Sequence, residues 1–545
     1  MKHRMIQTVV LLGAGILLGV CCQMMKKQQD HHTEEKKLQQ EWQKAASDPT
    51  TPYPETVVYK LAKMTASGDP MMPEGDTYED NAYTRFLKDF INVQNEDVSE
   101  VSEDDNYDLY VKRLIREGNA PDVMILSDLQ DVKDLTEEGA LEDLTDAYEN
   151  CTSDTIKEIY DSYGTELMDS VTIDGHIMAL PATQVYYGCS LFWVRQDWLD
   201  ELGLPAPETL DDVERIVLAF REHNMGGTGN IGLACMADLV GTGSSNYSLD
   251  PVFGAFGAYP QIWVQNAHGI YEYGSLKPET KEALAYLNQW YEKGVLDEDY
   301  MMRTTTEIGN LVKEGHCGAF FGWWWAPNSP LLASVSENPD AEWKPYLISG
   351  ENRRIQSYIS SKGTQYVVVR KDYEHPEVVM KIITALFDNA RFQGDSTDEI
   401  DQYQTIGVDV TARPLVINCD YSDAVFRTTQ RIENAFRDPS KVRKLSALER
   451  VYYEACQHYQ AGEKDPDLWA AYASRVEAVD LINQADITYI NQDYVQHSNQ
   501  GVSQEQQDLE ILSFMKIITG EEDISYFETF VDAWKKNMFL ENLSY

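Results

Sequence analysis

Short apolar runs alternate with longer amphipathic segments along most of the chain. The runs 57–62 and 121–126 are short and mainly apolar, which is typical of buried strands. The segments 83–91 and 278–293 place apolar residues three and four positions apart, which indicates helices with one buried face, and Gly294 marks the end of the second. Regular alternation of strands and helices predicts an α/β fold whose lobes are built on mostly parallel sheets.

The N-terminus has a different pattern. Lys2 and Arg4 form a short basic segment, and an unbroken apolar or glycine run follows from Val9 to Val20. As a helix this run spans about 18 Å, against about 30 Å of bilayer hydrocarbon. A basic start followed by a run of this length is typical of a secretory signal; a short uncleaved anchor helix is the alternative. In either case the rest of the chain lies outside the cytoplasmic membrane.

The apolar run ends in a pair of cysteines. The sequence Leu18-Gly-Val-Cys-Cys22 resembles the lipobox of bacterial lipoproteins, in which a diacylglycerol is attached to a cysteine that becomes the first residue. The resemblance implies a lipoprotein signal peptide over residues 1–22 and lipid attachment at Cys21. Cys22 is the alternative, because Val20 stands where the motif usually has a small residue.

Residues 23–54 combine lysine, glutamate and proline without a sustained apolar period. This composition predicts a flexible tether between the lipid and the folded part of the chain. Leu38, Trp42 and Ala45 share a helical spacing, so part of the tether can be helical.

The length and charge of the chain narrow its class. At 545 residues it is too long for one ordinary hydrophobic core and suits two lobes, and 43% hydrophobic residues are ample for packing them. The 90 acidic residues outnumber the 45 basic ones and give a formal net charge of −45. Because such a surface repels phosphate backbones, nucleic acid is excluded as a partner.

Motifs of enzyme and metal chemistry are missing. The sequence contains no HExxH, GxSxG or P-loop spacing, and no CxxC pair. The segment Gly227–Gly232 has the GxGxxG spacing, but it follows a predicted helix instead of a strand, so we expect a turn. We therefore predict no catalytic activity, no metal and no cofactor. The six cysteines after Cys22 are buried thiols or form one or two disulfides.

Several segments, in this order, resemble extracellular solute-binding protein family 1, most closely its long lipoprotein branch from Gram-positive bacteria. These segments are Asn81–Phe90, Gly118–Ile125, Asp174–Pro181, Leu191–Pro205, Thr209–Val213, Gly315–Pro327 and Ile517–Trp534. Together they extend the resemblance from about Val57 to the C-terminus. Many relatives carry an acidic loop able to hold calcium after the helix equivalent to 211–223; here His223–Gly232 contains no carboxylate, which argues against calcium.

The resemblance implies a two-lobe periplasmic-binding-protein-like fold of type II, with a hinge between the lobes. Lobe 1 would comprise residues 55–183 and about 346–395, and lobe 2 residues 184–345 and about 396–545. The ligand would lie in the cleft between them.

It also implies a function. A monomeric lipoprotein on the extracellular face of the cell membrane would bind a small solute, most simply a sugar or oligosaccharide, and deliver it to the permease subunits of an ABC importer. Two alternatives stay open: a surface ligand sensor with the same fold, and a surface enzyme acting on glycans.

Sugar receptors offer aromatic rings to the apolar faces of the sugar and polar side chains to its hydroxyls. Trp323, Trp324 and Trp325 are consecutive and follow the apolar run 319–321. If they continue a strand, alternate side chains face opposite ways, so at most two of them share one side. We expect at least one indole to contact the ligand and the rest to lie in the core.

Other candidates come from their position. Gln184, Tyr186 and Tyr187 lie at the inferred crossing between lobes, where the backbone passes the floor of the cleft. Asp128 follows a predicted strand at its carboxyl end, where open α/β sheets bind ligands, although it can equally cap the next helix. Trp263 is a weaker candidate of the same aromatic kind.

Overall fold

In the computed structural model the described residues are 34–102, 107–185, 188–240, 246–266, 268–349, 355–359, 365–491 and 502–541. The predicted signal peptide, Cys21, Cys22, Tyr186 and Tyr187 lie outside these residues. The chain divides into two compact units, here called lobe 1 (Met1–Thr183 and Gly363–Cys419) and lobe 2 (Gln184–Lys362 and Asp420–Tyr545).

The chain passes from lobe 2 to lobe 1 after Lys362 and returns to lobe 2 after Cys419. Both crossings come later in the chain than the expected positions near 346 and 395. Strand β12 (Ile355–Ile359) belongs to lobe 2 because it pairs in parallel with β14 (Ile487–Asn491). Helix α15 (Asp398–Ile406) belongs to lobe 1, where the ring of Tyr403 meets that of Tyr83 edge-on at 5.5 Å.

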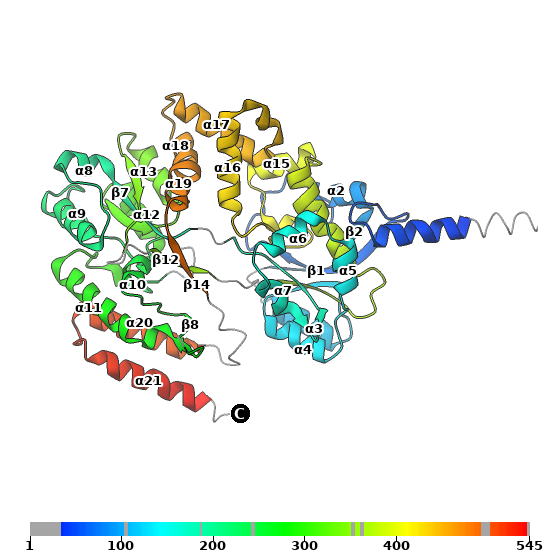
Figure 1. Cartoon of the computed structure of the whole chain (residues 1–545), viewed down its shortest axis with the longest axis horizontal. Helices are drawn as coiled ribbons and strands as arrows, with labels where there is room; N and C mark the ends of the chain where they lie inside the picture. The colour runs from blue at the N-terminus through cyan, green and yellow to red at the C-terminus, as the bar shows by residue number, and fades with distance from the viewer. Residues whose placement is uncertain are drawn as a thin grey trace, which may run out of the picture. The chain divides into compact units, whose positions relative to one another are not determined.

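Lobe 1 is built on a five-stranded sheet (Figure 1). Its order is β2 (Val93–Ser102), β1 (Val57–Thr65), β3 (Val123–Leu126), β13 (Tyr366–Val369) and β6 (Leu180–Pro181). The first three strands are parallel, and β13, which returns from lobe 2, lies antiparallel between β3 and β6. All four side chains of β3 are buried, in agreement with its continuous apolar sequence.

The helices of lobe 1 surround this sheet and confirm the predicted strand–helix alternation. In α2, Asn81 caps the first turn by accepting hydrogen bonds from the amides of Tyr83 and Thr84, and Phe86 and Leu87 face the core. The helices are α2 (Ala82–Ile91), α3 (Tyr107–Arg116), α4 (Leu129–Glu137), α5 (Thr145–Cys151), α6 (Asp154–Asp161), α7 (Glu166–Val171), α14 (Val378–Thr384) and α15, with the π-helical turn η5 (Ala385–Gln393) after α14.

The last part of the predicted tether is packed onto lobe 1. Residues 34–46 form a helix whose N-terminal end projects from the lobe, dark blue in Figure 1. The Trp42 ring stacks on His375 at 5.0 Å, and the buried Tyr53 hydroxyl donates to Glu377 at 2.7 Å. Residues 42–54 are therefore part of lobe 1, which corrects the expectation of a flexible tether up to residue 54.

A buried lysine holds this segment. Lys381 of α14 is 0% exposed, and its ammonium donates to the carbonyls of Ala45 at 2.9 Å, Asp48 at 2.7 Å and Thr51 at 2.7 Å. The ammonium also lies 5.0 Å from the centre of the Tyr53 ring. Burial lowers the pKa of Lys381, and these contacts offset the cost of the buried charge.

We expect Lys381→Met to release residues 42–54 from lobe 1. Without the ammonium, three partly buried carbonyls lose their donor, at a cost of about 1–3 kcal/mol each. Hydrogen exchange of the full chain should therefore show faster exchange in 42–54 and little change in β1 and β3. Lys371→Met, which removes an exposed ion pair with Glu142 in the same lobe, is the control. Unchanged protection of 42–54 in Lys381→Met would contradict the proposed role of the lysine.

Lobe 2 has a smaller, mainly antiparallel sheet. Its central strand β7 (Leu191–Arg195) pairs antiparallel with β10 (Ala319–Gly322) on one side and with β11 (Trp343–Tyr346) on the other. The expectation of mostly parallel sheets is therefore wrong for this sheet. Both strand pairings in this sheet are antiparallel, because the central strand β7 runs opposite to β10 and to β11.

Two further strand pairs and many helices complete lobe 2. Strands β8 (Trp263–Gln265) and β9 (Tyr271–Tyr273) form a hairpin, and β12 pairs with β14. The helices are α8 (Gln196–Leu202), α9 (Leu210–Glu222), α10 (Asp250–Ala255), α11 (Pro278–Lys293), α12 (Thr305–Lys313), α13 (Leu332–Glu337), α16 (Ala424–Arg437), α17 (Ala447–Gln460), α18 (Pro466–Tyr472), α19 (Ala478–Asn483), α20 (Gln504–Thr519) and α21 (Tyr526–Glu541).

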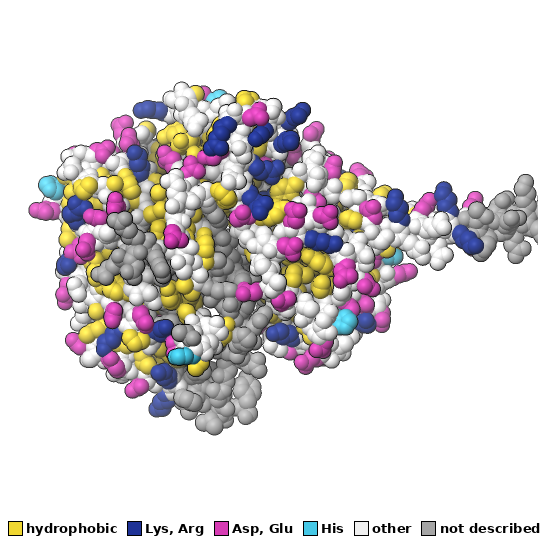
Figure 2. Space-filling model, in the orientation of Figure 1, with side chains coloured by type: hydrophobic (Ala, Val, Ile, Leu, Met, Phe, Trp, Pro, Cys, Tyr) yellow, Lys and Arg dark blue, Asp and Glu magenta, His cyan; other side chains and the backbone are white. Residues whose placement is uncertain are grey.

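Charged side chains of both signs lie on the surface, and the cysteines lie in the interior. Figure 2 shows carboxylates and basic side chains interspersed over the visible face, without a continuous basic stripe. The six cysteines after Cys22 are buried thiols. Within the part of the chain that the structure describes, no helix has both the length and the apolar character needed to cross a bilayer.

Candidate ligand-binding site

Trp323, Trp324 and Trp325 lie in a turn after β10 (Ala319–Gly322) and not in a strand. This segment is called the tryptophan turn below. Gly322, the last residue of β10, opposes Leu191, the first residue of β7, so no partner strand continues beyond it. The chain turns instead, and the amide of Ala326 donates to the carbonyl of Trp323 at 2.9 Å. The expected alternation of Trp323, Trp324 and Trp325 across a strand is therefore wrong, because strand geometry ends with the pairing that supports it.

Trp323 is a core residue. It is 6% exposed, its amide donates to Oδ1 of Asn246 at 3.0 Å, and its carbonyl accepts from the indole of Trp193 at 3.2 Å. Gly322 makes this packing possible, because a Cβ there would lie 2.7 Å from the same Asn246 oxygen. These contacts fix the start of the turn.

Trp324 and Trp325 are only half-buried, in contrast to Trp323. The Arg475 guanidinium lies over the Trp324 ring at 4.6 Å and over the Tyr452 ring at 4.3 Å, and it donates to the Tyr452 hydroxyl at 3.0 Å. This stack holds the plane of Trp324. The sequence gives no local signal for it, because Arg475 lies on the turn η8 (Ala473–Glu477), far along the chain.

In lobe 1, Asp128 lies at the carboxyl end of β3, as predicted. It is exposed and caps α4, because its carboxylate accepts from the amide of Gln130 at 2.8 Å. The carboxylate is also close enough to influence Tyr366, the first residue of β13: burial, and then the charge of Asp128, raise the pKa of the Tyr366 hydroxyl to about 12. Asp128 thus has the capping role, and its exposed carboxylate retains the capacity to accept hydrogen bonds from hydroxyls.

Gln184 is the first residue of lobe 2. Its side-chain oxygen is buried and has no hydrogen-bond partner among the described residues. Since buried polar atoms are normally satisfied, an unpartnered oxygen at this position is unusual. Tyr186 and Tyr187, the other candidates at this crossing, lie outside the described residues.

Trp263 belongs to an aromatic cluster that packs the end of the chain against lobe 2. Its ring lies 5.3 Å from that of Tyr273 and 6.4 Å from that of Trp534, and Tyr273 stacks on Trp534 at 4.7 Å. The residue is partly buried against the lobe 2 core. These contacts give Trp263 a packing role, which the isolated sequence motif did not reveal.

Among the described residues, no three His, Cys, Asp or Glu side chains are grouped so that they could hold a metal ion. The segment 223–232 forms turns, with positive φ angles at Gly227 and Gly229, in agreement with its prediction as a turn. What the described side chains offer is aromatic surface in lobe 2 and hydrogen-bonding groups in both lobes.

Comparison with known proteins shows the family to which the chain belongs. A family model described as bacterial extracellular solute-binding protein matches residues 69–390. The chain belongs to this family. It is 23% identical over 287 residues to the polygalacturonan/rhamnogalacturonan-binding protein YtcQ of Bacillus subtilis, covering 51% of this chain and 52% of YtcQ. It is also 23% identical over 259 residues to the fructooligosaccharide ABC transporter substrate-binding protein FusA of Streptococcus pneumoniae, covering 44% and 43%. The chain thus spans about half the length of these relatives.

A solved structure gives the same fold. The HMO-binding, ABC-transporter-associated solute-binding protein of Bifidobacterium longum infantis has a TM-score of 0.55 and 14% identity, over 89% of this chain and 97% of that one. Together with the lobe 1 strand order, in which a returning antiparallel strand is inserted next to β3, this confirms the predicted periplasmic-binding-protein fold of type II.

Proposed function

We propose that this solute-binding protein captures an oligosaccharide outside the cell and delivers it to an ABC importer. The observation that carries the proposal is the tryptophan turn of lobe 2, where Trp324 and Trp325 are half-buried and the Trp324 ring is held by Arg475. Flat indole surface suits the apolar faces of sugar rings. The names of YtcQ and FusA, two relatives that bind carbohydrates, support the same ligand class.

The fold supplies a mechanism for delivery. A ligand that touches both lobes favours the conformation in which they close around it, because only that conformation makes all the contacts. In this proposal the tryptophan turn and Gln184 act from lobe 2, and Asp128 acts from lobe 1. Permease subunits in the membrane would recognise the closed conformation.

The proposal includes a lipid anchor at Cys21, or at Cys22, and no catalytic activity. It is supported by the N-terminal motif and by a family that consists of solute-binding proteins. Because residues 42–54 pack on lobe 1, the leash between the lipid and the folded protein would be shorter than the 23–54 segment. Lobe 1 would then be the lobe held near the membrane.

A thermal-shift screen of the full chain tests the ligand class. Oligogalacturonides, fructooligosaccharides and maltooligosaccharides form the panel, and amino acids and short peptides are the controls. A bound ligand raises the free energy of unfolding by RT ln(1 + [L]/Kd), about 2.7 kcal/mol at a 100-fold excess over Kd. We expect at least one oligosaccharide to raise the melting temperature. Stabilisation by peptides or amino acids alone would refute the proposal.

A further inference from the structure

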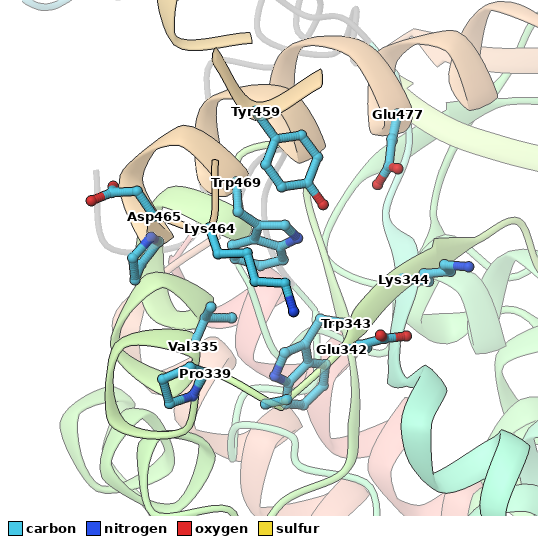
Figure 3. Close-up of a pocket in the computed structure, with 12 residues that line it drawn as sticks. Val335, Pro339, Glu342, Trp343, Lys344, Tyr459, Lys464, Asp465, Trp469 and Glu477 are labelled. Atoms are coloured by element: carbon cyan, nitrogen blue, oxygen red, sulfur yellow. The ribbon is translucent and has the colours of Figure 1, made fainter. Parts of the chain in front are cut away.

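A pocket lies wholly within lobe 2 (Figure 3). Its volume is about 260 Å³. Its walls come from the β11 segment, from the end of α13 and from the connection between α17 and α18. The lining residues are Val335, Pro339, Ala341, Glu342, Trp343, Lys344, Tyr459, Lys464, Asp465, Pro466, Trp469 and Glu477. None of these residues belongs to the candidate site described above.

The pocket shares no lining residue with the tryptophan turn, although Glu477 and Arg475 lie on the same turn η8. Trp343, the first residue of β11, opposes Arg195 at one end of β7, whereas Gly322, which precedes the turn, opposes Leu191 at the other end. Trp343 and Gly322 therefore lie beside opposite ends of β7, a strand of five residues that spans about 13 Å.

The lining combines aromatic rings with polar groups. Figure 3 shows Tyr459, Lys464 and Trp469 on the α17–α18 side, facing Glu342 and Trp343 of the β11 segment. Trp343 is 1% exposed, and its indole nitrogen donates to Ser334 at 3.1 Å, so this ring is a fixed wall. The Trp469 indole and the Tyr459 ring are only half-buried and present surface to the pocket.

The polar groups of this pocket are available to a ligand. Among the contacts of the described residues, no protein hydrogen bond or close ion pair occupies the Glu477 carboxylate or the ammonium groups of Lys344 and Lys464. Burial raises the pKa of Glu477, and the positive charge of Lys344 opposes this rise. A half-buried carboxylate without a donor is a natural acceptor for hydroxyl groups.

We propose that this pocket binds a single sugar ring. Rings of Trp469 and Tyr459 would pack on its apolar face, the Glu477 carboxylate would accept from its hydroxyls, and Lys464 would donate to its oxygens. The volume is somewhat below the ~300–1,000 Å³ of pockets that hold drug-sized ligands, and this favours one ring over a chain. Since every lining residue belongs to lobe 2, binding here does not depend on lobe closure.

Saturation-transfer NMR of the full chain with D-glucose, D-galactose and D-galacturonate tests the proposal. A ligand of this size is expected to bind with a Kd of about 1 mM. Trp469→Ala and Glu477→Gln should each weaken it by about tenfold or more, whereas Trp469→Phe should retain most of it. Glu463→Gln is the control, because Glu463 is an exposed carboxylate in the same connection and lies outside the pocket.

Two results would overturn the proposal. One is the absence of saturation transfer to all three sugars in the wild-type chain. The other is transfer that persists unchanged in Glu477→Gln and in a Trp469→Ala variant that melts normally. If Trp469→Ala does not fold, Glu477→Gln and Lys464→Met decide, since each should weaken saturation transfer. Failure of this site is distinguishable from failure of the proposed function, because the pocket variants should still be stabilised by the oligosaccharide found in the thermal-shift screen.

Discussion

Replacing Trp324 or Trp325 by alanine is expected to weaken binding of the cognate oligosaccharide by about 30- to 1000-fold, the range that loss of an interface hot spot produces. Both side chains are only half-buried, so we expect their removal to take away a binding platform more than it opens the core. Calorimetric titration of each variant measures the effect, and a thermal melt shows whether the fold survives.

Trp323→Ala is the matched contrast. Its side chain is buried, so truncation should lower the free energy of unfolding by about 3–5 kcal/mol. Binding by the fraction that stays folded should change much less than in the other two variants. If all three variants bind normally and only melt earlier, the whole turn is structural and the ligand lies elsewhere.

The second large effect concerns a buried carboxyl in lobe 2. Glu510 of α20 is 1% exposed; Ser275 donates to its Oε1 at 2.7 Å, and Oε2 has no partner among the described residues. Burial raises the pKa of Glu510 from 4.5 to about 7. Below about pH 7 the folded chain therefore keeps this carboxyl neutral, with the Tyr273 hydroxyl as its other polar neighbour.

The free energy of unfolding should therefore fall as pH rises. Since the folded pKa is the higher one, the contribution of Glu510 to stability is complete below the unfolded pKa and is lost as pH rises through the folded pKa. The difference between the two pKa values corresponds to about 3 kcal/mol.

Glu510→Gln should remove this loss. At about pH 8 the variant should be more stable than the wild type by up to about 3 kcal/mol, and below about pH 4.5 the two should converge. Denaturant unfolding of both chains across this range measures the difference, with Glu505→Gln, an exposed carboxylate in the first turn of the same helix, as the control. A variant less stable than the wild type at the alkaline end would contradict the assigned pKa shift.

Local patterns predicted four elements well: the strands over 57–62 and 121–126 and the helices over 83–91 and 278–293. Helix α11 spans the predicted residues 278–293, because Pro278 suits its first turn and Gly294, at φ 76°, ends it. Helix α2 begins one residue before its predicted start, at the Asn81 cap. Such signals lie within a few residues of the features they determine, so one sequence suffices to read them.

The features that the sequence patterns did not predict depend on contacts between residues distant in the chain. The tryptophan run continues an apolar strand in sequence, but the strand ends where β7 begins, and no local pattern shows this. The tether residues 42–54 look like linker, and Lys381, which holds them, lies more than 300 positions later. Likewise, Arg475, which lies over the Trp324 ring, comes from a turn of the same lobe that is far along the chain.

Calorimetric titration of the full chain with the best oligosaccharide from the thermal-shift screen tests whether the tryptophan turn binds sugar. We expect one oligosaccharide bound per chain with a Kd of about 1 μM or tighter, and a much weaker interaction in Trp325→Ala. Binding at the same affinity in Trp324→Ala and Trp325→Ala, or no heat with any oligosaccharide from a chain that is folded by its melting curve, would contradict it.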